Sequence, residues 1–142
     1  MREEQIRTDK VTCVGELPVT TVARTALDLA ARFLPRDIAV AHLDALACAT
    51  GVSAADAIAL AARYPGARGI RRARVALALM DGGAQSPKET WLRLVLIDGG
   101  LPRPRTQIRV SDGVDEAFID LGYDEPMVGL DYDGAHHSKD RG

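Results

Sequence analysis

The sequence has few cysteines, few aromatic residues and no long apolar run, and each shortage excludes a class of protein. Two cysteines, Cys13 and Cys48, cannot build a disulfide scaffold or a four-cysteine metal site in this 142-residue chain. Six aromatic residues argue against the stacking platforms that bind single strands of nucleic acid. No run of about 18 apolar residues is present, and no apolar segment follows the charged N-terminus. We therefore expect a cytoplasmic protein with neither a membrane span nor a secretion signal.

The charges are present in ordinary number but are distributed unevenly. Residues 63–109 carry nine arginines and Lys88 against three acids, a balance of +7. Residues 110–142 carry nine acids against Lys139 and Arg141, a balance of −7. A metal-dependent nuclease needs both kinds of charge, because cations contact phosphates and carboxylates hold the metal. On charge alone, two solvated surfaces that neutralise each other are the simpler interpretation.

The first half of the chain has the patterns of helices. Capping residues, proline and glycine predict helices over about 21–33, 35–51, 53–64 and 68–80. In the first of these, the apolar residues at helical spacing are Val22, Ala26, Leu29, Ala30 and Phe33. Asp81-Gly82-Gly83 then breaks the chain. We expect residues 1–83 to form a helical prefix and residues 84–142 to form a second domain.

The second half changes character. Ser86 is placed to cap a helix that ends at Asp98, before Gly99-Gly100. Three short alternating segments follow and predict strands over about Thr106–Val110, Glu116–Leu121 and Met127–Asp133. The predicted fold class is therefore α+β, with a helical N-terminal half followed by an α-β-β-β unit.

Alternation along the predicted strands brings three carboxylates together. Asp131 and Asp133 share a face of the third strand, and Asp120 can lie beside them when the strands pair. Neighbouring carboxylates repel one another unless they are protonated or neutralised by a cation. Their oxygen ligands suit Mg²⁺ or Mn²⁺. Three solvated acids on an exposed sheet face are the alternative.

Glu89 and two histidines are further candidates for this site. Glu89 shares a helical stripe with Leu92 and Leu96, the face that should pack on the sheet. A capping box with Ser86 explains the same glutamate, and both roles can hold at once. His136 and His137 directly follow the third strand and can move a proton or donate to a phosphate oxygen. Exposed loop histidines are the simpler interpretation.

Two resemblances to known families rest on several stretches of the chain. SPKETWLRLVLIDGGLPRPRTQIRV, FIDLGY and VGLDYDGAHH together resemble the domain of unknown function 559, within residues 84–140. That family is allied to the very-short-patch-repair endonucleases of the PD-(D/E)xK nuclease superfamily. VTTVARTALDLAARF resembles the helical region of AbiEi-type antitoxins, which often precedes this domain in actinobacteria. The resemblance implies a restriction-endonuclease-like core in the second half of the chain.

The nuclease resemblance implies a role for each candidate residue. Glu89 matches the helix glutamate of the family and Asp120 matches its central metal-binding aspartate. Asp131 takes the acidic position of the D/E-x-K element, and Asp133 stands where the superfamily usually has lysine. His137 matches the trailing histidine of the D-G-x-x-H pattern. The implied reaction is hydrolysis of a DNA phosphodiester, with Mg²⁺ or Mn²⁺ held by Glu89, Asp120 and Asp131.

Other features bear on partners. The candidate contacts to DNA phosphates are Arg71, Arg72, Arg74, Arg103 and Arg105. Relatives begin with a winged helix and continue past the histidines with a helix and a strand, so we expect a truncated nuclease-like domain here. The strand Met127–Asp133 is then left with an open edge, so we expect either a homodimer through this edge or poor order beyond about Gly134. The alternative function is a non-catalytic, antitoxin-like or regulatory module that binds DNA, a toxin or another protein.

Overall fold

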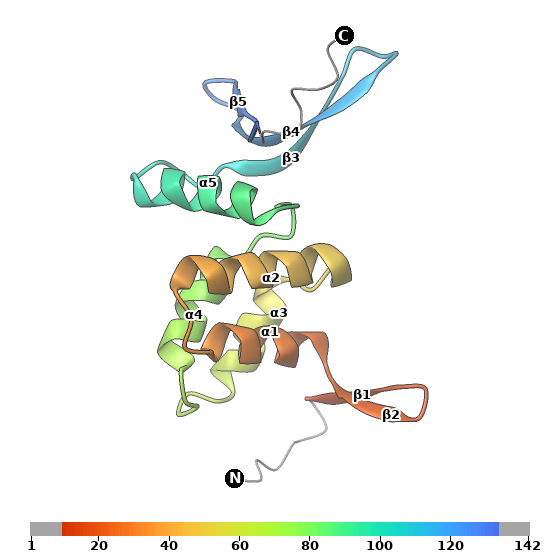
Figure 1. The fold of residues 1–142 in the computed structure, drawn as a ribbon, viewed down its shortest axis with the longest axis vertical. Coiled ribbons are helices and arrows are strands. Elements are labelled where there is room, and N and C mark those ends of the chain that lie inside the picture. Colours follow the sequence, from red (N-terminus) through yellow and green to blue (C-terminus); the bar gives the residue numbers. More distant parts are fainter. Residues whose placement is uncertain (1–9, 134–142) are drawn as a thin grey trace. The chain divides into compact units, whose positions relative to one another are not determined.

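The protein has an α+β fold, seen in a computed structural model that describes residues 10–133 (Figure 1). The chain divides into two compact units, Met1–Gly82 and Gly83–Gly142. The described elements are, in chain order, β1 (Val11–Val14), β2 (Leu17–Thr20), α1 (Val22–Ala31), α2 (Arg36–Thr50), α3 (Ala54–Ala62), α4 (Ile70–Leu79), α5 (Pro87–Asp98), β3 (Arg105–Ser111), β4 (Glu116–Tyr123) and β5 (Val128–Leu130).

The first unit begins with a hairpin that the sequence pattern does not predict. Strands β1 and β2 pair antiparallel, with Val11 opposite Thr20. The backbone N–H of Thr21 donates to the carbonyl oxygen of Lys10 at 2.8 Å, which joins the hairpin to the start of α1. The Lys10 ammonium lies 3.9 Å from the ring centroid of Tyr64, and the Lys10 side chain is buried. The hairpin is thus attached at its base, while its strands stay largely exposed.

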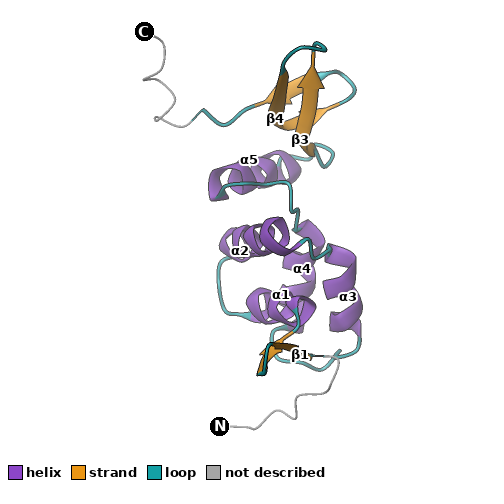
Figure 2. Ribbon diagram, turned by 90° about the vertical axis from the view of Figure 1, so that its right-hand side faces the viewer, coloured by secondary structure: helices purple, strands orange, loops and turns teal. Residues whose placement is uncertain are grey.

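Four helices form the core of the first unit, at the positions that the sequence predicts (Figure 2). Side chains cap the first turns of two of them: Thr21, rather than its neighbour Thr20, accepts from the backbone N–H of Arg24, and Ser53 accepts from that of Asp56. Helices α1 and α4 each contact the other three helices. The fully buried core residues include Ala26, Val40, Leu43, Ala57, Ala73 and Leu77. The many alanines among them allow the helices to approach one another closely.

Gly69 brings the start of α4 against the end of α1. Its φ of 78° lies in the left-handed region, and a Cβ atom placed there would lie 2.4 Å from the carbonyl oxygen of Ala31. Only glycine satisfies both the backbone conformation and this close approach. This close approach holds the start of α4 beside the turn that leaves α1.

We expect Gly69→Ala to lower the free energy of unfolding by about 2–4 kcal/mol, because it combines backbone strain with overpacking. Gly66→Ala is the matched control, since Gly66 lies in the same loop and a Cβ atom added to it would have no other atom within 4 Å. Urea unfolding followed by circular dichroism measures both variants. Equal stability of the two would contradict this account of the α1–α4 contact.

The second unit consists of α5 and a three-stranded antiparallel sheet in the order β3-β4-β5. Helix α5 contacts β4, and Leu121 of β4 is fully buried. The predicted stripe of α5 is partly wrong, because the residues buried with Glu89 are Thr90, Arg93 and Leu94 rather than Leu92 and Leu96. In the β3–β4 turn, backbone N–H groups of Asp115 and Val114 donate to Asp112 and hold the pKa of its carboxyl below its ordinary value.

The third strand is shorter than predicted. The sequence pattern predicts a strand over Met127–Asp133, but β5 covers Val128–Leu130. Met127 has a φ of 60° and belongs to the preceding turn, so it starts no strand. Within residues 10–133, β5 pairs with β4 alone. The homodimer through the other edge of β5 stays a prediction.

The described helices offer no single membrane span. None is by itself long and apolar enough to cross a bilayer, and α2 and α3 reach that length only together, across a bend of 116°.

Candidate functional site

Asp120 and Asp131 come together at the end of the β4–β5 pairing. The last paired residues are Leu121 and Leu130. Beyond them, Asp131 Oδ1 accepts from the backbone N–H of Asp120 at 3.0 Å, and Asp120 Oδ2 accepts from that of Tyr132 at 2.9 Å. Each carboxylate therefore satisfies a backbone donor of the opposite segment. These bonds replace the strand ladder past Leu130, which explains why β5 ends there although the aspartates stay together.

The carboxylates of this aspartate pair can fill two coordination positions of a hard divalent cation. The two bonds use one oxygen of each carboxylate, and within residues 10–133 the other oxygen of each accepts no hydrogen bond. Asp131 is exposed and Asp120 is half-buried, so a hydrated ion can reach them. Mg²⁺ is commonly held by one or two carboxylates and keeps several waters. In the described part of the chain, no three His, Cys, Asp or Glu side chains gather into a metal site.

Both carboxylate oxygens of Glu89 accept hydrogen bonds at the start of α5. Its Oε2 accepts from the backbone N–H of Gln85 at 2.9 Å, and its Oε1 accepts from the Ser86 hydroxyl at 2.9 Å. The Glu89 backbone N–H donates to the same hydroxyl at 3.2 Å. The predicted capping box is thus confirmed. Each oxygen of Glu89 thus already accepts a hydrogen bond that the capping box explains, and its role as a ligand stays a prediction.

Of the remaining candidates of this group, the structure describes Asp133 alone. Asp133 is exposed, and the structure gives it no hydrogen bond or ion pair within residues 10–133. His136 and His137 lie outside the described residues. The roles that the resemblance implies for Asp133 and His137 therefore stay predictions.

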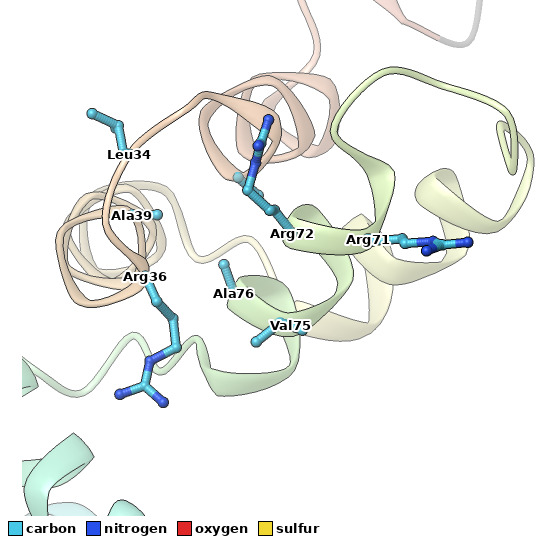
Figure 3. Close-up of a pocket in the computed structure, with 8 residues that line it drawn as sticks. Leu34, Arg36, Ala39, Arg71, Arg72, Val75 and Ala76 are labelled. Carbon is cyan, nitrogen blue, oxygen red and sulfur yellow. The ribbon is translucent and has the colours of Figure 1, made fainter.

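Two of the three arginines of α4, Arg71 and Arg72, point in different directions. Arg72 extends toward α1, whereas Arg71 extends away from the other labelled side chains (Figure 3). The Arg72 guanidinium carbon lies 5.0 Å from the ring centroid of Phe33, and its Nη2 lies 3.5 Å from the Ala31 carbonyl oxygen. Arg71 and Arg74 are exposed and three residues apart, so they are neighbours on the helix surface. A phosphate row on α4 would therefore use Arg71 and Arg74 together.

The two candidate arginines of the second unit are exposed. Arg105 Nη1 lies 2.6 Å from Asp124 Oδ1, in an ion pair whose side chains are 61% and 68% exposed. Pairs this exposed contribute little and exchange readily, so Arg105 can turn to a phosphate. Arg103 lies two residues before β3 and is also exposed.

The first unit has two concave surfaces beside Arg72. One is an apolar pocket of about 310 Å³ among α1, α2 and α4, with Arg36 and Arg72 extending from it in opposite directions (Figure 3). The other is an open hollow of about 510 Å³, lined by Asp28, Ala31, Arg32, Phe33, Arg68 and Arg72. Sequence reasoning misses this second surface because it assigns Phe33 to the apolar stripe of the first helix. That assignment is wrong: α1 ends at Ala31 and Phe33 is 89% exposed.

Comparison with known protein families, with curated proteins and with solved structures finds no match for this chain.

Proposed function

We propose that this protein is a metal-dependent, nuclease-like DNA-binding protein in which Asp120 and Asp131 hold Mg²⁺ or Mn²⁺. The observation that carries the proposal is the pair of reciprocal bonds between the two aspartates and the opposite backbone. These bonds keep two like charges together, and a divalent cation offsets their repulsion. When bound, the cation supplies Lewis-acid activation for phosphodiester hydrolysis.

The side chains of this chain then have distinct tasks. Asp120 and Asp131 bind the cation and are themselves oriented by the backbone N–H groups that they accept from. Arg71 and Arg74 attract the phosphates of DNA without reading its sequence. Arg103 and Arg105 are proposed to do the same in the second unit.

A second candidate is a non-catalytic module that binds DNA, a toxin or another protein. The observation that favours it is the capping role of Glu89, which uses both carboxylate oxygens. A protein that has only two of the three expected ligands in place can bind DNA without cleaving it. Nicking of supercoiled DNA with added Mg²⁺ or Mn²⁺ separates the candidates, because only the first predicts product that disappears in Asp120→Asn and Asp131→Asn.

The arginine row on α4 predicts strongly salt-dependent binding to duplex DNA. Each phosphate contact contributes about 0.9 to the slope of log affinity against log salt. Between about 50 and 200 mM salt, the wild type should therefore lose about tenfold more affinity than the double variant Arg71→Gln, Arg74→Gln. Fluorescence anisotropy of a labelled duplex measures both slopes. Lys88→Gln, at an exposed position of α5, should lower the slope less, and equal slopes for all three proteins would contradict the proposal.

A further inference from the structure

Phe33 presents an aromatic ring to solvent in a strongly basic setting. It lies in the short turn between the end of α1 at Ala31 and the start of α2 at Arg36. Phe33 is 89% exposed, and the Arg72 guanidinium lies 5.0 Å from the ring centroid. A guanidinium at this distance makes a cation–π contact, which favours this placement of the ring beside Arg72. The ring is thus positioned by its neighbour and is still accessible.

The hollow around Phe33 is positively charged. Three arginines line it, Arg32, Arg68 and Arg72. Asp28 is the one acidic residue of this lining, and its Oδ1 is paired with Arg24 Nε at 2.8 Å. The hollow therefore attracts an anion, and within its lining the competing carboxylate is already neutralised.

An aromatic face beside arginines matches the chemistry of a nucleotide. A nucleobase stacks on an aromatic ring, while the attached phosphate accepts hydrogen bonds from guanidinium groups. One ring accommodates one base, so the site needs no row of aromatic residues and agrees with the low aromatic content of the chain. A base inside a duplex is already stacked on both faces, so only an unpaired base is available to Phe33.

We propose that Phe33, Arg32, Arg68 and Arg72 form a binding site for a single unpaired nucleotide, whose base stacks on Phe33 and whose phosphate binds the arginines. The proposal rests on the DNA binding proposed above, and it identifies the kind of DNA as duplex that contains a bulge, a flap or a single-stranded end. A free nucleotide carries the same chemistry and is the other source of the ligand.

The test measures how tightly the whole 142-residue chain binds four probes, each used as a labelled ligand or as a competitor. They are a fully paired duplex, the same duplex with one unpaired adenine, a short single strand and free dAMP. Fluorescence anisotropy should give tighter binding of the bulged duplex than of the paired one. Loss of base stacking typically lowers affinity by roughly fivefold to a hundredfold. Phe33→Ala should therefore lower the affinity for the bulged duplex by a factor in this range, so that the preference for the bulge disappears.

The variants separate stacking from simple apolar contact and from general charge. Phe33→Leu keeps an apolar side chain without an aromatic face and should behave like Phe33→Ala. Arg32→Gln and Arg68→Gln should weaken binding of the bulged duplex and of dAMP. Arg72 is left unchanged because it also contacts the Ala31 carbonyl oxygen. The matched control is Arg71→Gln, whose side chain points elsewhere, and it should lower affinity for both duplexes equally (Figure 3).

Each outcome decides between the inferences. A preference for the bulged duplex that depends on Phe33 supports the nucleotide site. If dAMP binds as tightly as the short single strand, the site is assigned to free nucleotides. Duplex binding with the predicted salt slope but no effect of Phe33→Ala overturns the nucleotide site and leaves the proposed function standing. No binding of any probe overturns this inference together with the proposed DNA binding. Wild-type behaviour of Phe33→Leu also overturns it, because an apolar contact would then be sufficient.

Discussion

Mg²⁺ or Mn²⁺ should raise the melting temperature of the wild-type protein by several degrees and leave that of Asp120→Asn unchanged. An ion that binds only the folded state at ten times its Kd stabilises by about 1.4 kcal/mol, and in a domain as small as the second unit this corresponds to several degrees. Asparagine retains an oxygen that can accept from the Tyr132 N–H, so the backbone arrangement of the pair is preserved. Only the negative charge and the carboxylate ligand are lost.

Without metal, the same substitution should no longer leave the protein less stable than the wild type. In EDTA, Asp120→Asn relieves the repulsion between two neighbouring carboxylates and should be at least as stable as the wild type. Asp115→Asn is the matched control, because Asp115 is an exposed acid in the β3–β4 turn. It should show the full metal-dependent increase. Differential scanning fluorimetry with and without metal measures all three proteins, and an equal increase in wild type and Asp120→Asn would contradict the metal site.

The helices of this protein could be predicted from local sequence because their ends carry specific signals. Thr21, Ser53 and Ser86 each precede a helix, and each side chain accepts the backbone N–H that capping requires. Such a signal depends on a few consecutive residues, so no knowledge of the tertiary structure is needed. The β1–β2 hairpin has no comparable signal, since its exposed strands bury no alternating apolar face.

The exposed position of Phe33 could not be predicted because apolar periodicity continues past the point where the helix ends. Phe33 follows the spacing of Ala26 and Ala30, both of which are buried. Helix α1 nevertheless ends at Ala31, and the chain turns toward α2 before Phe33 can join the core. The close approach of Gly69 to the Ala31 carbonyl oxygen is a tertiary constraint between residues far apart in the sequence. Periodicity carries no information about such a contact.

The candidate site was predictable in part for a similar reason. Strand alternation places Asp120 beside Asp131, and the structure has the two side by side. Alternation also places Asp133 with them, because it assumes that the third strand continues. The strand ends at Leu130 once the two aspartate side chains take over the backbone donors, and the periodicity of two then no longer applies.

Glu89 supports two interpretations in the sequence, and a pair of substitutions separates them. Glu89→Ala removes both capping bonds at the start of α5 and should lower the free energy of unfolding by about 1–2 kcal/mol. Glu89→Gln keeps an oxygen for the capping box, in which glutamine is also a common residue, and should be close to the wild type in EDTA. Urea unfolding in EDTA measures this part of the prediction.

The change in melting temperature of the same variants on adding metal then shows whether the Glu89 carboxylate is a metal ligand. Because both oxygens of Glu89 are bound at the helix start, we expect Glu89→Gln to keep the full metal-dependent increase in melting temperature. Glu89→Ala should begin from a lower melting temperature and show the same increase. A Glu89→Gln protein that is stable in EDTA but does not respond to Mg²⁺ or Mn²⁺ would instead make Glu89 a ligand. In that case Glu89 would hold the ion as well as cap α5, because a carboxylate oxygen that accepts one hydrogen bond keeps a further lone pair.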